Sequence, residues 1–151
     1  MKPEDLPAIY GLLPGTARAL IDALGVTHAC ALLNARPGCE IRVPKHADRH
    51  PEGTRRWAEL VGIVGTDGTQ ALATHWGGEI LDVPTCDQAR REIRHRAIRA
   101  EFDRLTTEAG LSGRQAIYEI GLQYAPISSR AIEMICGRAD AGQAEQQDMF
   151  A

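Results

Sequence analysis

Glycine and proline divide the last third of the chain into three short segments with helical character. The first segment, residues 85–109, is followed by Gly110; the second, residues 113–124, precedes Pro126; the third, residues 128–136, is followed by Gly137. Proline lacks a backbone donor and glycine readily ends a helix, so helices rarely run through these positions. The spacing therefore predicts three helices joined by two turns.

A hydroxyl side chain precedes each of these segments, at Thr85, Ser112 and Ser128. Hydroxyls at this position accept hydrogen bonds from the free N–H groups of the first helical turn. We therefore expect all three residues to be N-caps. The first segment is rich in arginine, whereas the two that follow are short and mostly apolar on one side.

The second and third segments have the form of a helix-turn-helix. Ala116, Ile117, Ile120 and Gly121 form the packing face of its first helix, where Gly121 is expected to allow a close approach. The turn is Ala-Pro or Ala-Pro-Ile, and Ile132 and Ile135 face inward from the second helix. A plain helical hairpin has the same spacing and stays open at this point.

The outer face of the third segment carries residues that can read DNA. We expect Ser129, Arg130 and Glu133 to contact bases, with Met134 beside them. Arginine can donate two hydrogen bonds to guanine, glutamate can accept one from cytosine, and serine is permissive. Ser128 and the free N–H groups at this helix start are predicted to hold a phosphate.

Basic residues are concentrated in the same part of the chain. Residues 86–138 contain nine arginines against seven acidic residues, although the whole chain has a net charge of −3. We expect Arg90, Arg94 and Arg114 to contact DNA phosphates. The alternative is a solvated helix face on which arginines pair with glutamates one turn away.

The part before residue 85 predicts several helices and two short strands. One of these helices is expected to have Thr27 as its N-cap, and another to extend from Pro51 to Gly65. Residues 39–43 alternate in polarity, and residues 79–84 form a second extended segment after Gly77 and Gly78. The predicted fold is mainly α, with an N-terminal helical region and a short β-strand pair. The predicted parts are residues 1–76, a Gly-Gly and strand linker at 77–84, a DNA-binding domain at 85–138 and a flexible tail at 139–151.

Other functional classes lack their usual signals. The sequence shows no nucleophile elbow, phosphate-binding loop or zinc-protease motif, so we expect no enzyme and no cofactor. His46, Asp48 and His50, with Cys39 nearby, are the best candidate metal ligands, but two prolines enclose their segment and no metal site is predicted. The four cysteines are widely spaced, which favours small buried thiols in a reducing cytoplasm. No signal peptide and no apolar run of membrane-spanning length are visible.

Several pieces, in order and at consistent spacing, resemble one family. They are PEDLPAIYGLL, CEIRVP, HWGGEILDVP, ARREIRHRAIRAEFDRL and GLSGRQAIYEIGLQYAPISSRAIEMI, and the resemblance extends from about residue 4 to residue 136. In this arrangement the chain resembles the Mor/C family of middle and late transcription activators of Mu-like phages and prophages.

The resemblance implies a homodimer in which residues 1–76 form the dimerisation region. It also implies that two helix-turn-helix domains bind an inverted repeat in double-stranded DNA, that Gly77 and Gly78 approach the DNA, and that the protein activates phage or prophage genes by recruiting host RNA polymerase. A repressor, or a dimeric adaptor without an activation role, has the same architecture. The turn before Ser128 is a residue longer than the family form and contains Pro126, which leaves the base-reading residues open.

Overall fold

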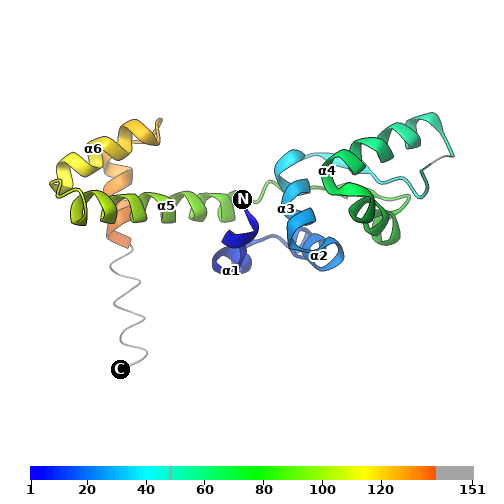
Figure 1. Cartoon of the computed structure of the whole chain (residues 1–151), viewed down its shortest axis with the longest axis horizontal. Coiled ribbons are helices and arrows are strands. Elements are labelled where there is room, and N and C mark those ends of the chain that lie inside the picture. Colours follow the sequence, from blue (N-terminus) through cyan, green and yellow to red (C-terminus); the bar gives the residue numbers. More distant parts are fainter. Residues whose placement is uncertain (48, 139–151) are drawn as a thin grey trace, which may run out of the picture. The chain divides into compact units, whose positions relative to one another are not determined.

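A computed structural model describes residues 1–47 and 49–138, and the predicted tail at 139–151 lies outside the described residues. The chain separates into two units, Met1–Arg90 and Arg91–Ala151. Both are mainly helical, and the first also contains a small antiparallel sheet (Figure 1). The expected fold class is confirmed at this level. Residues 77–84, expected to be a separate linker, belong to the first unit.

The first unit begins with a series of short helices. They are η1 (Pro3–Asp5), α1 (Leu6–Ile9), η2 (Tyr10–Leu12), α2 (Gly15–Leu24) and α3 (Val26–Ala35). Their apolar residues form a core in which Ile9, Leu20, Leu32 and Leu33 are fully buried. The residue before α3 is Gly25, so the expected N-cap at Thr27 is wrong.

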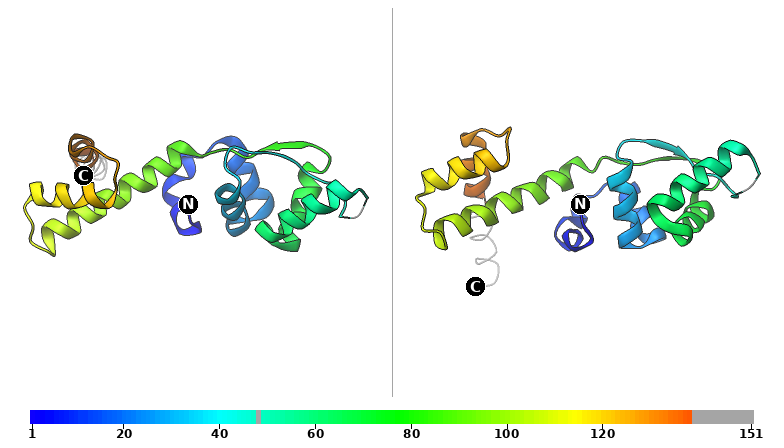
Figure 2. Two further views of the ribbon diagram at one scale, coloured as in Figure 1. Left: turned by 90° about the horizontal axis from the view of Figure 1, so that it is seen from above. Right: turned by 45° about the horizontal axis from the view of Figure 1, so that its top comes forward.

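The two predicted strands pair with each other. Strand β1 (Glu40–Arg42) lies antiparallel to β2 (Ile80–Asp82), with Ile41 opposite Leu81 (cyan and green in Figure 2). Backbone hydrogen bonds continue on both sides of the ladder, from Gly38 to Val83 and from Val43 to Glu79. Leu81 and Val43 are buried, so this short sheet is anchored in the core of the first unit.

Helix α4 (Pro51–Trp76) is interrupted at Gly65. Gly65 has φ 75° and ψ 175°, a backbone conformation that is essentially restricted to glycine. The buried Thr69 hydroxyl donates to the Gly65 carbonyl at 2.8 Å, one turn into the second half. The two halves are separate coiled ribbons in Figures 1 and 2. The interruption falls at the glycine where the sequence predicts a helix end.

Helix α5 (Asp87–Thr107) begins two residues after Thr85. The Arg90 N–H donates to the carbonyl of Cys86, which has φ 58°. Thr85 is therefore not the N-cap that its hydroxyl suggested. None of the four cysteines, all of which lie within the described residues, forms a disulfide, and burial raises the pKa of Cys30 and Cys86. Cys39 is exposed, contrary to the expectation that all four are buried.

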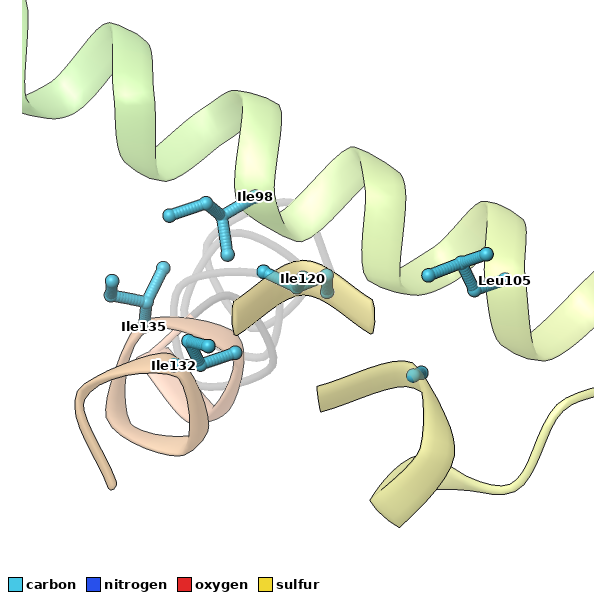
Figure 3. Packing of buried hydrophobic residues seen from close by; sticks show 6 residues of the cluster. Ile98, Leu105, Ile120, Ile132 and Ile135 are labelled. Carbon is cyan, nitrogen blue, oxygen red and sulfur yellow. The ribbon is translucent and has the colours of Figure 1, made fainter. Parts of the chain in front are cut away.

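The second unit is built around one apolar core. Helix α6 (Gly113–Gln123) and a helix at 129–138 pack against α5. Ile98 and Leu105 of α5 form a core with Ile120 of α6 and with Ile132 and Ile135 of the last helix (Figure 3). Ala116 is also buried there, and Phe102 and Leu111 pack against the edge. Ser112 caps α6 as predicted, since its side chain accepts from the Gln115 N–H at 3.2 Å.

Gly121 of α6 faces the helix at 129–138, as expected. A Cβ added at Gly121 would lie 3.8 Å from Cδ1 of Ile132, which is ordinary van der Waals contact. The packing therefore leaves room for a methyl group. The expected role of Gly121, to allow an approach too close for a side chain, is wrong.

Candidate nucleic-acid interface

The turn between α6 and the helix at 129–138 is anchored in the core of the second unit. Tyr124, the C-cap of α6, and Ile127 both pack against the apolar cluster. The Ala125–Pro126 peptide bond between them is cis. The longer turn thus packs two side chains against the core, and Ile127 was not among the predicted core residues because it lies among turn residues.

Ser128 starts the helix that follows, as predicted. Its side-chain oxygen accepts from the Ala131 N–H at 3.1 Å, and its carbonyl accepts from the Ile132 N–H at 3.1 Å. The hydroxyl hydrogen of a serine that accepts in this way can still be donated to another group. Ser128 is exposed, so an external oxygen can reach its hydroxyl.

The helix at 129–138 has one buried and one exposed face. Ile132 is fully buried and Ile135 nearly so, whereas Ser129, Arg130 and Glu133 are exposed. Residues three and four apart share a face of a helix, so these three exposed residues lie together. Met134, 54% exposed, adds an apolar surface beside them. The structure therefore brings the expected base-facing residues onto one surface.

Several arginines of α5 are paired within the helix. Glu92 accepts from Arg99 at 2.9 Å and from Arg96 at 3.0 Å, and Glu101 binds Arg104 at 2.7 Å. Partial burial would raise the pKa of Glu92, but the hydrogen bonds and charges of its two arginines outweigh burial and lower it. These three guanidiniums are largely neutralised, as the alternative interpretation of the arginine run proposed.

His95 lies in the same charged region of α5. Burial lowers its pKa, the Glu92 carboxylate opposes that change, and nearby guanidiniums, including Arg99, lower it further. The fold therefore favours the neutral imidazole. His95 adds no fixed positive charge to the surface.

Arg90 has a different role from the expected phosphate contact. Its guanidinium donates to the Thr85 carbonyl at 2.8 Å, to the Leu33 carbonyl at 2.8 Å and to Asn34 Oδ1 at 3.1 Å. The side chain thereby ties the C-terminal end of α3 to the segment before α5. Because its donors are occupied inside the first unit, we do not include Arg90 in the candidate interface.

Arg94 is also engaged, though it stays exposed. Its Nη2 donates to the carbonyl of Tyr124 at 2.7 Å and so links α5 to the C-terminal end of α6. A cation at this position also interacts favourably with the negative end of the helix dipole. Arg94 is therefore placed to position the turn before Ser128, and its remaining N–H groups face solvent.

Four arginines of the second unit make no ion pair or hydrogen bond to another described residue. They are Arg91, Arg114, Arg130 and Arg138, and all four are exposed. Arg114 was predicted as a phosphate contact and lies in the first turn of α6. Arg91 and Arg138 were not predicted as contacts. What distinguishes these two arginines is the lack of a partner among the described residues, which the sequence does not show.

Gly77 and Gly78 lie in the first unit, where they connect α4 to β2. The Glu79 N–H donates to the Trp76 carbonyl at 2.9 Å, Gly77 has φ −55° and ψ 123°, and Gly78 has φ 83°. These values describe a type II turn, which requires a positive φ at its third residue. The turn accounts for glycine at 78 without any contact with DNA.

The remaining candidate sites receive little support. Among residues 1–47 and 49–138, no three His, Cys, Asp or Glu side chains gather closely enough to hold a metal ion. Asp48 of the considered ligand set lies outside the described residues. None of the helices within the described ranges is both long and apolar enough to span a membrane.

Comparison of the chain with models of known protein families, with curated proteins and with solved structures finds no match.

Proposed function

We propose that this chain is a sequence-specific DNA-binding regulator of transcription whose DNA-reading element is the helix at 129–138. One observation carries the proposal: a helix capped by Ser128 buries Ile132 and Ile135 and exposes Ser129, Arg130 and Glu133 on its other face. In a helix-turn-helix, the second helix enters the major groove with its N-terminal side chains on base edges. The three exposed residues occupy that N-terminal part.

The exposed residues divide into two chemical roles. Arg130 donates to guanine, and Glu133 accepts from cytosine. Ser128 and Arg114 bind phosphates, Ser128 through its hydroxyl and the adjoining helix start. Arg94 positions the turn through the Tyr124 carbonyl, and any phosphate contact that it makes comes through its remaining donors.

The wider biological role rests on the resemblance to the Mor/C family. It comprises a cytoplasmic homodimer that binds an inverted repeat, recruits host RNA polymerase and activates phage or prophage genes. A repressor of the same architecture differs only in what its DNA-bound form does to polymerase.

A second candidate function is a protein-interaction module. Tyr118 and Leu122 are 59% and 62% exposed and lie four residues apart on α6. Such a pair on one helix face is an apolar surface that a partner protein can cover. An interaction module of this kind does not need DNA, so DNA binding distinguishes the two candidates.

The test is selection of a binding sequence from a library of randomised duplexes, followed by fluorescence anisotropy with the selected and a scrambled duplex. Arg130→Ala should lose about 1–3 kcal/mol of discrimination between the two duplexes. Arg114→Ala should weaken both duplexes alike and reduce the salt slope by about one. Arg104→Ala is the matched control, because Glu101 already engages that guanidinium.

The proposal fails if no duplex is enriched, or if affinity does not change with salt concentration, because phosphate contacts always release counterions. It also fails if Arg104→Ala weakens binding as much as Arg114→Ala. Light scattering at micromolar concentration should give a dimer mass. A strict monomer would remove the argument for an inverted repeat.

A further inference from the structure

The first unit contains a hollow of about 390 Å³ where the segment after β1 meets the start of α4. Its wall includes Arg42, Lys45, Arg49 and Arg56, together with Glu52 and Gly78. All of these residues lie within Met1–Arg90, so the hollow belongs to one unit. It takes no part in the proposed helix-turn-helix.

The charge of this hollow is strongly unbalanced. Four arginine or lysine side chains surround it, and among residues 1–47 and 49–138 Glu52 is the only acidic residue of its lining. None of the four forms an ion pair with a described residue; by contrast, the neighbouring Arg55 pairs with Glu59. The Arg56 Nη1 donates to the Arg42 carbonyl at 3.4 Å, a contact that does not balance its charge. Cations held together without a carboxylate repel one another, and a bound anion relieves that repulsion.

The backbone adds donors to the same wall. Pro51 is the first residue of α4, and the preceding His50 makes no side-chain cap hydrogen bond. The N–H groups of Glu52 and Gly53 therefore stay without a partner among the described residues, whereas the Thr54 N–H donates to the His50 carbonyl at 2.8 Å. Free N–H groups at the start of a long helix favour an anion, especially phosphate.

Gly78 makes room for one of the cations. A Cβ at position 78 would lie 2.4 Å from Cε of Lys45 and 3.4 Å from its Nζ. The lysine side chain therefore crosses directly over the glycine backbone, and any other residue at 78 would displace it. Glycine at this position thus serves both the type II turn and the placement of Lys45 at the hollow.

From this geometry we infer that the hollow binds phosphate groups. Guanidinium groups match the oxygens of a phosphate through paired hydrogen bonds, and the lysine adds a point charge. A volume of about 390 Å³ leaves room for a ligand with two adjacent phosphate groups. Such groups occur in free phosphorylated molecules and along a polynucleotide backbone.

The test uses the full-length chain and two probes, pyrophosphate and a short duplex of scrambled sequence. Calorimetric titration at constant ionic strength measures the first, and fluorescence anisotropy measures the second. The double variant Lys45→Gln, Arg56→Gln should lower the affinity for whichever probe binds at least about tenfold, because each substitution removes a charge-assisted hydrogen bond. Arg55→Gln, on the same helix but outside the lining of this hollow, is the matched control.

The two probes distinguish the sources of phosphate. Loss of pyrophosphate binding in the double variant supports a free phosphorylated ligand, and a loss confined to the duplex supports a polynucleotide backbone. The inference is overturned if neither probe binds, or if the double variant matches Arg55→Gln with both probes. Should the double variant not fold, Arg49→Gln provides the same comparison, because Arg49 is exposed and its replacement leaves the core intact. If the hollow binds no phosphate, the proposed DNA-binding function is still tested by Arg130→Ala, because Arg130 lies in the other unit.

Discussion

Replacing Ile132 with alanine tests whether the second unit depends on one shared core. Ile132 is fully buried and packs in the cluster with Ile98 and Ile120 (Figure 3). Truncating a buried isoleucine to alanine costs about 2–5 kcal/mol, with the larger values where the surroundings cannot move into the cavity. Here the cavity opens beside Gly121, which has no side chain to fill it. We therefore expect a loss in the upper part of that range.

The size of the second unit makes this loss decisive. Its described part has about fifty residues, which at roughly 0.05–0.15 kcal/mol per residue gives a stability of about 2–7 kcal/mol. Ile132→Ala should therefore unfold most of this unit. Ile132→Val, which removes one methyl group, should cost about 0.5–1.5 kcal/mol and leave the unit folded.

Hydrogen exchange followed by mass spectrometry measures the outcome element by element. In Ile132→Ala, the amides of α6 should lose protection, whereas those of α2 and α3 in the first unit should keep it. Ile132→Val should stay close to the unsubstituted chain in both regions. Unchanged protection of α6 in Ile132→Ala would refute the shared core, and equal loss in α2 and α3 would refute the division into two units.

Three further substitutions test individual contacts. Gly121→Ala should raise the stability of the second unit by about 0.5–1 kcal/mol in chemical denaturation, since the added methyl lies 3.8 Å from Ile132 Cδ1 and glycine weakens a helix interior; a loss would mean that the helices are closer than described. Arg90→Lys should destabilise the first unit by about 1–3 kcal/mol, because an ammonium does not reproduce three hydrogen bonds to separate acceptors, whereas Arg91→Lys should have no effect. Glu92→Gln should lower stability at neutral pH. The fold lowers the pKa of Glu92 from 4.5, so its stabilisation is complete above 4.5 and is lost as pH falls through the folded-state value. The difference in melting temperature between the two proteins should therefore shrink in acid, and a constant difference would contradict the ion pairs.

Local signals in the sequence predicted most of the helices. Ser112 and Ser128 are N-caps as expected, and the helix interruption falls at Gly65. The signals are sufficient there because a cap or a break depends on residues within one turn. The same reasoning failed at Thr27 and Thr85, where the chain begins the helix one or two residues away from the hydroxyl.

The roles of the arginines were not predictable in this way. Arg90 finds acceptors at Leu33 and Asn34, more than fifty positions earlier, and Arg94 finds one at Tyr124, thirty positions later. A periodic pattern identifies which side of a helix is polar, but it does not reveal which distant carbonyl will face that side. Only the folded arrangement separates structural arginines from available ones.

This separation sets how strongly the proposed interface should respond to salt. Of the six arginines in α5, three are paired with carboxylates and two donate to carbonyls, which leaves Arg91. With Arg114, Arg130 and Arg138, the second unit then offers four free guanidiniums. At a slope of about −0.9 per neutralised phosphate, these contribute about −4 per chain at most. A much steeper slope that persists in the Lys45→Gln, Arg56→Gln double variant would mean that paired arginines of α5 exchange glutamate for phosphate on binding, so that DNA competes directly with the ion pairs that stabilise this helix.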